Sequence, residues 1–271
     1  MQNIKEYVAL KKEEIKREIE NNKYEIQTVV IQVGDNPASN AYIKGKLADC
    51  DAVGIKCNLL KYEEDITEDY LLNVIKELNE RKCITGFIVQ LPLPKHINEQ
   101  KVIEAINYKK DIDGFTKQAL VNPATPQGII DYLEYNNFDF VDKNAIVIGR
   151  SNIVGRPMAR LLLDRSCNVM VTHSKTSSVN LHNALIDADL VVVATGHRNT
   201  LSNYDVQGRV KSTCFLVDVG INRNENNKLC GDCEHITCIE KTPVPGGVGL
   251  LTRLALITNI LKLYKINNKL N

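Results

Sequence analysis

An aromatic ring and an amine lie four residues apart in the run Ser39-Asn-Ala-Tyr42-Ile-Lys-Gly-Lys46. On a helix, Tyr42 and Lys46 would share one face, so a flat substrate could pack on the ring beside the amine. Burial of that amine would lower its pKa and allow it to exchange protons near neutral pH. The competing interpretation is a solvated surface lysine, and the spacing alone does not choose between them.

Two loops further along the chain carry polar groups that could act together with such an amine. Gln90 is the one polar side chain in Val89-Gln-Leu-Pro-Leu-Pro94. Asp111 and Asp113 form a pair of carboxylates at a turn that ends with Gly114. No third carboxylate or histidine cluster accompanies the pair, so we expect hydrogen bonds to a substrate in preference to a metal site. Capping of the turn by the aspartates themselves is the alternative.

Residues 242–249 read Thr-Pro-Val-Pro-Gly-Gly-Val-Gly. The prolines fix φ and the glycines permit most φ values, so the segment cannot be a regular helix or strand. We predict a shaped loop whose backbone can approach a flat ligand closely, followed by a helix from Leu250. A tight structural turn without a ligand is the alternative.

The second half of the chain contains a strand, a glycine-bearing turn and the start of a helix at residues 145–157. Gly149, Ser151 and Gly155 give the spacing G-x-S-x-x-x-G, which resembles the dinucleotide-binding turn without matching the usual G-x-G-x-x-G. Pro157 fits the first helical turn, where its missing N–H is not needed. In such turns the helix N-terminus binds a pyrophosphate. An ordinary turn between strand and helix is the alternative.

The residues after the next predicted strand favour a phosphorylated cofactor. An NAD enzyme usually places an acidic residue about 20 residues after the glycine turn, where it binds the adenosine ribose. Here the chain reads Thr172-His-Ser-Lys-Thr176, and a hydroxyl at Ser174, an amine at Lys175 and nearby Arg150 suit a 2′-phosphate instead. The sequence therefore predicts NADP. His173 is expected to orient its neighbours or to fill space.

The elements that must position these groups alternate between strands and helices along almost the whole chain. Apolar runs predict strands at residues 28–33, 56–60, 86–90, 145–148, 169–172, 190–194 and 215–219. Helices are expected at 39–53 with Ser39 as cap, at 68–79 with Thr67 as cap, at 99–107 and from Gly128. This alternation predicts the α/β class, with parallel sheets covered by helices in two consecutive domains.

Two further glycine turns end strands in the second half, at Thr195-Gly196 and at Gly220-Ile221. The carboxyl ends of the strands form the ligand-binding edge of an open α/β sheet. Both turns are therefore expected to face the cofactor.

The composition is that of an ordinary globular protein and argues against several classes of function. The 271 residues carry a formal net charge of +1, which gives no electrostatic reason to bind nucleic acid or an anionic membrane. No apolar run approaches the ~20 residues of a membrane span, and the N-terminus lacks the apolar core of a signal peptide, so we expect a cytoplasmic protein. Eight scattered cysteines indicate reduced thiols. The lone C-x-x-C at Cys230 and Cys233 is interpreted as incidental, with no metal bound.

Several motifs, in order and spanning nearly the whole chain, are similar to those of the bifunctional methylenetetrahydrofolate dehydrogenase/cyclohydrolase family. They are residues 34–46, 90–93, 111–114, 149–155, 173–176, 218–222 and 242–249. The resemblance implies a folate-binding catalytic domain at residues 1–121 that is completed by a helix at 250–271. It also implies a Rossmann-like NADP-binding domain at 122–249, with the active site in the cleft between the two.

The same resemblance implies roles for individual residues. Lys46 would be the catalytic lysine, Gln90 its partner and Asp113 the aspartate that binds the pterin, while Tyr42 stacks on the substrate. Other implied substrate contacts are Ser39, Pro245, Gly246 and Gly247, and the implied cofactor contacts are Gly149, Arg150, Ser151, Ser174, Thr195 and Ile221. The family oxidises 5,10-methylenetetrahydrofolate with NADP, hydrolyses the methenyl product to 10-formyltetrahydrofolate and typically forms homodimers.

Departures from the family pattern bear on the substrate site. Leu250-Leu251 stands where the family usually has Pro-Met, at a wall expected near the folate. Pro123-Ala-Thr-Pro126 stands where the family often has Pro-Cys-Thr-Pro. A dehydrogenase without cyclohydrolase activity is the nearest alternative function, because both reactions share one pocket. A non-catalytic NADP-binding protein would need the glycine turns, but it would not need Tyr42, Lys46, Gln90 and Asp113 together.

Overall fold

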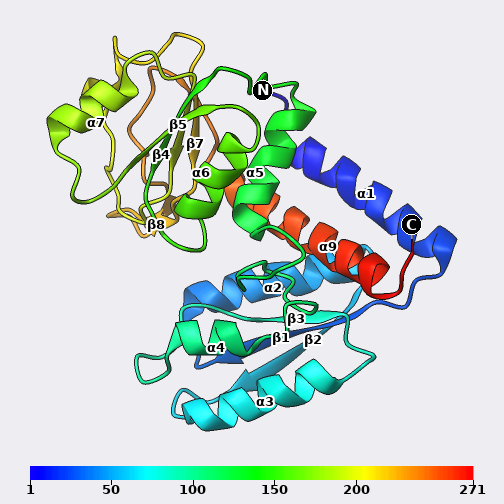
Figure 1. Cartoon of the computed structure of the whole chain (residues 1–271). Coiled ribbons are helices and arrows are strands. Elements are labelled where there is room, and N and C mark those ends of the chain that lie inside the picture. Colours follow the sequence, from blue (N-terminus) through cyan, green and yellow to red (C-terminus); the bar gives the residue numbers. More distant parts are fainter. Residues whose placement is uncertain (271) are drawn as a thin grey trace. The chain divides into compact units, whose positions relative to one another are not determined.

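The computed structural model describes residues 1–270, apart from the side chain of residue 38. The chain divides into two compact units (Figure 1). The five-stranded unit comprises Met1–Val8 and Thr125–Thr252, and the three-stranded unit comprises Ala9–Ala124 and the segment from Arg253 onward. Two long helices, α1 (Ile4–Asn22) and α9 (Val248–Asn267), contribute residues to both units. No helix within the described residues combines the length and the apolar character that crossing a membrane requires.

The three-stranded unit is built on a parallel sheet in the order β2-β1-β3. Its strands are β1 (Gln27–Val33), β2 (Lys56–Tyr62) and β3 (Gly86–Val89). The predicted strands of both halves of the chain are all present, with bounds within two residues of those predicted. The inner strands are mostly apolar and buried on both faces, as expected for parallel strands, whereas the edge strands β2 and β5 (Asn168–Thr172) are largely exposed.

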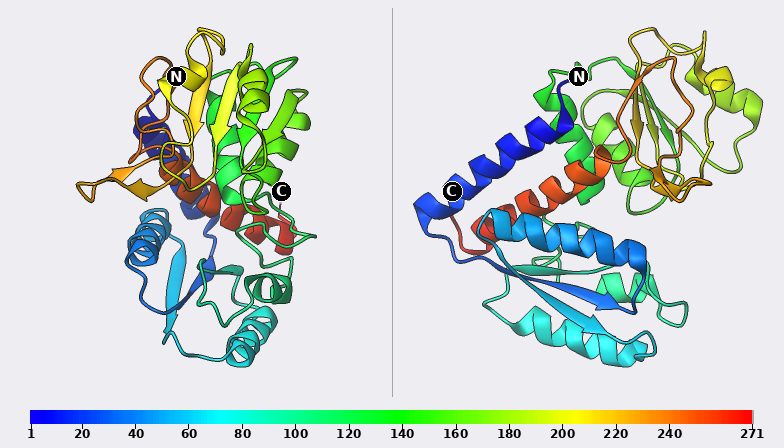
Figure 2. Two further views of the ribbon diagram at one scale, coloured as in Figure 1. Left: turned by 90° about the vertical axis from the view of Figure 1, so that its left-hand side faces the viewer. Right: turned by 180° about the vertical axis from the view of Figure 1, so that it is seen from behind.

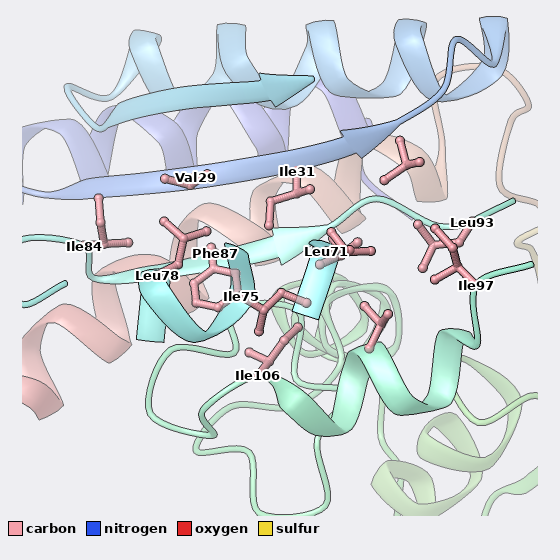
Figure 3. Packing of buried hydrophobic residues seen from close by; sticks show 13 residues of the cluster. Val29, Ile31, Leu71, Ile75, Leu78, Ile84, Phe87, Leu93, Ile97 and Ile106 are labelled. Atoms are coloured by element: carbon pink, nitrogen blue, oxygen red, sulfur yellow. The ribbon is translucent and has the colours of Figure 1, made fainter. Parts of the chain in front are cut away.

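Helices cover both faces of this sheet. Figure 2 shows α2 (Pro37–Ala52) on one face and α3 (Glu68–Glu80) on the other, with α4 (Glu99–Ala105) beside α3. Side chains alternate along β1, so Val29 and Ile31 point towards α3. There they pack with Leu71, Ile75 and Phe87 in one hydrophobic cluster (Figure 3).

One of the two predicted helix caps is confirmed and the other is wrong. Thr67 accepts a hydrogen bond from the backbone N–H of Tyr70 and caps α3 as predicted. Ser39 does not cap α2, because this helix begins at Pro37. The side chain of Asn36 accepts from the N–H of Ser39 at 3.3 Å, and Pro37 supplies a φ already suited to the first helical position. Ser39 therefore lies inside the first turn.

The five-stranded unit contains a parallel sheet in the order β10-β7-β6-β4-β5. Its strands are β4 (Asn144–Ile148), β5 (Asn168–Thr172), β6 (Leu190–Val193), β7 (Phe215–Asp218) and β10 (Glu240–Lys241). A separate antiparallel pair joins β8 (Asn222–Arg223) to β9 (Leu229–Cys230). The strands β8, β9 and β10 are each two residues long, too short to give an apolar run in the sequence.

Four helices complete this unit: α5 (Ala124–Tyr135), α6 (Gly155–Leu163), α7 (Ser178–Leu185) and α8 (Asn203–Val206). Helix α5 begins four residues before the predicted Gly128. Pro126, which suggested a turn in the sequence, falls in the first turn of α5, where backbone N–H groups have no partner within the helix. Pro157 lies in the first turn of α6, as predicted.

Both sheets contain a point at which successive connections leave in opposite directions. In the three-stranded sheet β1 lies between β2 and β3, and in the five-stranded sheet β4 lies between β5 and β6. The loops that follow the two strands at such a point diverge and leave a crevice at the carboxyl edge, where open α/β sheets bind ligands. The topology thus predicts one site beyond β1 and β3 and another beyond β4 and β6.

Candidate functional site

Lys46 and Gln90 are in hydrogen-bond contact, with Nζ of the lysine 3.1 Å from Oε1 of the glutamine. Lys46 lies on α2 and is only 5% exposed. Gln90 directly follows β3, and its Nε2 donates to the carbonyl of Leu91 at 2.7 Å, which turns its amide oxygen towards the amine. A glutamine oxygen accepts a hydrogen bond without removing the proton. Gln90 can therefore orient the amine in either protonation state.

Tyr42 and Asp113 lie beside this lysine. The Tyr42 ring centroid is 5.6 Å from Nζ of Lys46. Burial lowers the pKa of the Lys46 amine, and the negative charge of Asp113 opposes this shift. Burial raises the pKa of the Asp113 carboxyl, Lys46 opposes that shift, and Asp111 adds to it. The three-stranded unit therefore brings together the four residues predicted for catalysis and substrate stacking.

The two aspartates of the Asp111–Gly114 turn have different roles. Asp111 is buried and accepts from the N–H groups of Gly114 at 2.9 Å and of Thr116 at 2.7 Å. For Asp111 the capping interpretation is thus correct. Asn259 on α9 donates to the carbonyls of Ile112 and Asn122, each at 3.0 Å, and so fixes the backbone beside Asp113. Sequence reasoning missed Asn259, because the two carbonyls it binds lie far from it along the chain.

Helix α2, which carries Lys46, is anchored to α1 and α9. Asp49 on α2 forms ion pairs with Lys12 on α1 and with Arg253 on α9. The Arg253 side chain crosses α2 at Gly45, where an added Cβ would lie 1.8 Å from a guanidinium nitrogen. The glycine next to the predicted catalytic lysine therefore makes room for the arginine. This role could not be predicted locally, because Arg253 lies far along the chain.

The remaining predicted substrate contacts are divided between the units. Ser39 is buried in the first turn of α2 in the three-stranded unit. Pro245 and Gly246 belong to the five-stranded unit, where they line a cavity of about 340 Å³ together with residues 1–5. Gly247 follows them and directly precedes α9, which begins two residues before the predicted Leu250.

A second cavity of about 370 Å³ lies at the carboxyl edge of the five-stranded sheet. It is formed by the loops that follow β4, β5 and β6, where the strand order predicts a ligand. The predicted cofactor contacts that line it are Gly149, Arg150, Ser151, Ser174 and Thr195. Ile221 is 52% exposed and is not among the lining residues.

The glycine turn after β4 is shaped by close backbone packing. Gly149 has a φ of +123°, and an added Cβ would lie 2.3 Å from the carbonyl oxygen of Ala194. The Ser151 hydroxyl accepts from the N–H groups of Val154 at 3.2 Å and Gly155 at 3.3 Å. Ser151 therefore holds the entry to α6, whose N-terminus carries the partial positive charge that favours a phosphate.

The lining of this cavity fits a phosphorylated dinucleotide. Thr172 contributes a hydroxyl that is buried and has no hydrogen-bond partner within the described residues. The lining includes Arg150 and no carboxylate among the described residues. His173 also lines the cavity, and its Nδ1 accepts from the N–H of Lys175 at 3.2 Å, an orienting contact of the kind expected. A polar ligand would give the Thr172 hydroxyl a hydrogen-bond partner. Because no carboxylate lines the cavity among the described residues, a phosphate on the ribose would meet no negative charge there.

Cys230 and Cys233 of the C-x-x-C motif are both buried free thiols. Burial raises the pKa of both thiols, which disfavours the thiolates that bind metals and attack disulfides. Within residues 1–270, no group of three or more His, Cys, Asp or Glu side chains is placed to hold a metal ion.

Known proteins match both halves of the chain. Residues 2–113 match the family model for the catalytic domain of tetrahydrofolate dehydrogenase/cyclohydrolase, and residues 123–268 match the model for its NAD(P)-binding domain. The bifunctional protein FolD of Listeria innocua is 43% identical over 255 residues, which cover 89% of this chain and 88% of that protein. The protein of the same name from Campylobacter hominis is 45% identical over 249 residues, covering 87% and 86%.

A solved structure agrees with these matches. The crystal structure of the bifunctional enzyme FolD, a methylenetetrahydrofolate dehydrogenase/cyclohydrolase from Campylobacter jejuni, superposes with a TM-score of 0.87. Its sequence is 38% identical, and the match covers 98% of each chain. Both parts of the chain, the one with the buried lysine and the one with the glycine turn, are thus matched in order. The chain belongs to the tetrahydrofolate dehydrogenase/cyclohydrolase family.

Proposed function

We propose that this protein oxidises 5,10-methylenetetrahydrofolate to the methenyl form with NADP and hydrolyses that product to 10-formyltetrahydrofolate. The observation that carries the proposal is the buried Lys46 amine, hydrogen-bonded to Gln90 beside Asp113 and Tyr42. A protein that only bound the cofactor would have no use for this group. We assign the folate chemistry to the three-stranded unit and cofactor binding to the five-stranded unit.

For dehydrogenation, the protein's own contribution is positioning. When bound, NADP supplies the acceptor for the hydride that leaves the folate. Tyr42 would pack against the aminobenzoyl ring, Asp113 would accept hydrogen bonds from the pterin, and Ser39 would line the same site. Pro245, Gly246 and Gly247 are proposed as further folate contacts. Gly149, Arg150, Ser151, Ser174, Thr195 and Ile221 are proposed to hold the cofactor.

For hydrolysis, Lys46 is proposed to move protons. Because burial lowers its pKa, the amine is neutral more often than a solvated lysine. In the neutral form it can take a proton from the water that attacks the methenyl carbon, and in the charged form it can return a proton to the opening ring. Gln90 would keep the amine directed at the reacting atoms throughout this cycle.

An assay that follows two signals in one sample tests the proposed function. The purified protein is mixed with methylenetetrahydrofolate and NADP, while reduced cofactor and methenyltetrahydrofolate are recorded by absorbance. We expect the reduced cofactor to accumulate faster than the methenyl form, because hydrolysis removes the latter. Equal accumulation of reduced cofactor and methenyltetrahydrofolate would mean that the protein is a dehydrogenase without cyclohydrolase activity. The absence of both signals would refute the proposal.

We expect at least a ~10-fold preference for NADP over NAD in kcat/KM, because contacts to a charged phosphate typically contribute about 1.5–3 kcal/mol. The preference rests on Arg150 and Ser174, which line a cavity whose described residues include no carboxylate. Kinetics with each cofactor measure it. Arg150→Ala should lower kcat/KM for NADP and leave that for NAD nearly unchanged. A higher value with NAD in the wild type would contradict the assignment.

The family resemblance also supports a cytoplasmic homodimer that acts in one-carbon metabolism and binds neither nucleic acid nor membrane. Light scattering of the purified protein measures the oligomeric state directly.

A further inference from the structure

Asp232 is a fully buried carboxylate in the middle of the C-x-x-C motif. Its Oδ2 accepts from the backbone N–H groups of Thr195 at 2.8 Å and Gly196 at 2.9 Å, and from the Thr195 hydroxyl at 2.9 Å. Its Oδ1 accepts from the side-chain amide of Asn222 at 2.9 Å. Among the described residues, no ion pair includes Asp232. These neutral donors together satisfy the carboxylate.

A second buried carboxylate holds Asp232 in place. Asp218, at the end of β7, accepts from the backbone N–H groups of Asp232 at 2.8 Å and Cys233 at 2.9 Å. Gly220 and Gly231 make room for this arrangement. A Cβ added at Gly220 would lie 1.9 Å from Oδ1 of Asp232, and one added at Gly231 would lie 1.9 Å from Oδ2 of Asp218. The glycines after β7 and inside the C-x-x-C are thus required by the two carboxylates.

The contacts of Asp232 determine what the turn after β6 presents to the cofactor cavity. Thr195 lines that cavity. The Thr195 hydroxyl donates to Oδ2 of Asp232, the same oxygen that accepts from the two backbone N–H groups of the turn. The Thr195 oxygen also accepts from the backbone N–H of His197 at 3.2 Å and lies 2.6 Å from the Thr200 hydroxyl, so the side chain is held within the loop. The contact of the hydroxyl with Asp232, with those of the two backbone amides, fixes the direction of the turn.

We propose that Asp232 is a positioning residue of the cofactor site, which fixes the Thr195-Gly196 turn where it lines the cavity for the dinucleotide. The inference rests on the proposed function for the identity of the cofactor. It assigns a role to the C-x-x-C segment that depends on the residue between the cysteines and not on the thiols.

Asp232→Ala removes the carboxylate that accepts hydrogen bonds from the backbone N–H groups of Thr195 and Gly196 and from the Thr195 hydroxyl. We expect the Kd for NADP, measured by calorimetry, to rise by roughly tenfold or more. Hydrolysis of preformed methenyltetrahydrofolate, which consumes no cofactor, should change less than threefold. Asp232→Asn should restore affinity to within about threefold, because its Oδ1 can face the turn while its NH2 donates to Oδ1 of Asn222 once the Asn222 amide flips. Asp232→Ser, which retains a single short hydroxyl, replaces the alanine variant if that variant does not fold.

Asp189→Ala is the matched control. Asp189 is also a buried carboxylate of the same unit, accepting from the N–H of Asn144 at 2.9 Å and pairing with Lys211 at 2.8 Å. It directly precedes β6, at the edge of the sheet opposite the cavity. This variant should lose stability without a change in the Kd for NADP. Equal weakening by both variants, or wild-type affinity in Asp232→Ala, would overturn the positioning role.

Amide hydrogen exchange in the ligand-free protein separates this inference from the proposed function. The N–H groups of Thr195 and Gly196 should exchange at least tenfold faster in Asp232→Ala than in the wild type, and Asp189→Ala should leave them protected. A wild type that binds no dinucleotide would refute the proposed cofactor, while unchanged exchange in Asp232→Ala would refute the role of Asp232.

Discussion

Replacing Lys46 with methionine is expected to reduce cyclohydrolase activity by about 10²–10⁴-fold, the usual contribution of a positioned acid–base group. Dehydrogenase activity should fall less, because hydride transfer requires no proton from the protein, and methenyl product should accumulate. Methionine keeps the length and apolar stem of the side chain and removes the amine. The two-signal absorbance assay measures both activities in one reaction.

Lys44→Met is the matched control, since Lys44 lies on the same helix and is exposed. It should leave both activities unchanged. Survival of both activities in Lys46→Met would mean that Lys46 moves no protons. Loss of both in a folded protein that still binds NADP would mean that Lys46 positions the folate.

Lys46→Met should also be more stable than the wild type at neutral pH. Burial lowers the pKa of Lys46 below its ordinary value of 10.5, so the unfolded chain binds this proton more tightly than the folded protein. Below the folded-state pKa, the wild type therefore carries the full penalty of a buried charge that Lys46→Met lacks. As pH rises from that pKa towards 10.5, the penalty disappears. Thermal unfolding at several pH values should show a difference that shrinks with increasing pH.

Gly149→Ala is expected to lower the free energy of unfolding by about 2–4 kcal/mol and to weaken NADP binding by at least ~10-fold. The added Cβ would lie 2.3 Å from a backbone oxygen of Ala194, and alanine would have to adopt a φ of +123°. Neither backbone segment can move without displacing β4 or β6. Denaturant unfolding and calorimetric titration with NADP measure the two effects.

Gly208→Ala distinguishes the collision from the backbone strain. Gly208 also has a positive φ, +72°, but an added Cβ there would meet nothing within 4 Å. Its expected destabilisation is about 1 kcal/mol, from the left-handed conformation alone. It should leave the Kd for NADP unchanged. Equal losses in the two variants would show that the close approach at Gly149 is unimportant.

The sequence predicts those parts of the fold and the candidate site that depend on short segments. Strands β1 and β4 are largely apolar, and the glycine turn follows β4 directly, so their type and order are visible in the chain. Tyr42 and Lys46 share a helix face because four residues make about one turn. Helix α2 was placed two residues too late because Asn36-Pro37 is a stronger start than Ser39.

Contacts between distant segments could not be predicted in the same way. Gly45 is explained only by Arg253, and the backbone beside Asp113 is fixed by Asn259. The C-x-x-C motif does not reveal the role of Asp232, because its partners Thr195 and Asn222 lie on other loops. In each case the sequence shows a residue type without its partner, and only the packing of the chain brings the two together.

The anchoring of α2 by α9 has a consequence for synthesis on the ribosome. The strands β1, β2 and β3 emerge early. Arg253, which pairs with Asp49, emerges only after the whole five-stranded sheet. The same holds for Asn259, which binds the carbonyls of Ile112 and Asn122. Until then Asp49 lacks one of its two cations, and the turn that carries Asp113 lacks its restraint. The segment that bears the proposed chemistry is therefore the part of the protein that matures last, although it is translated first.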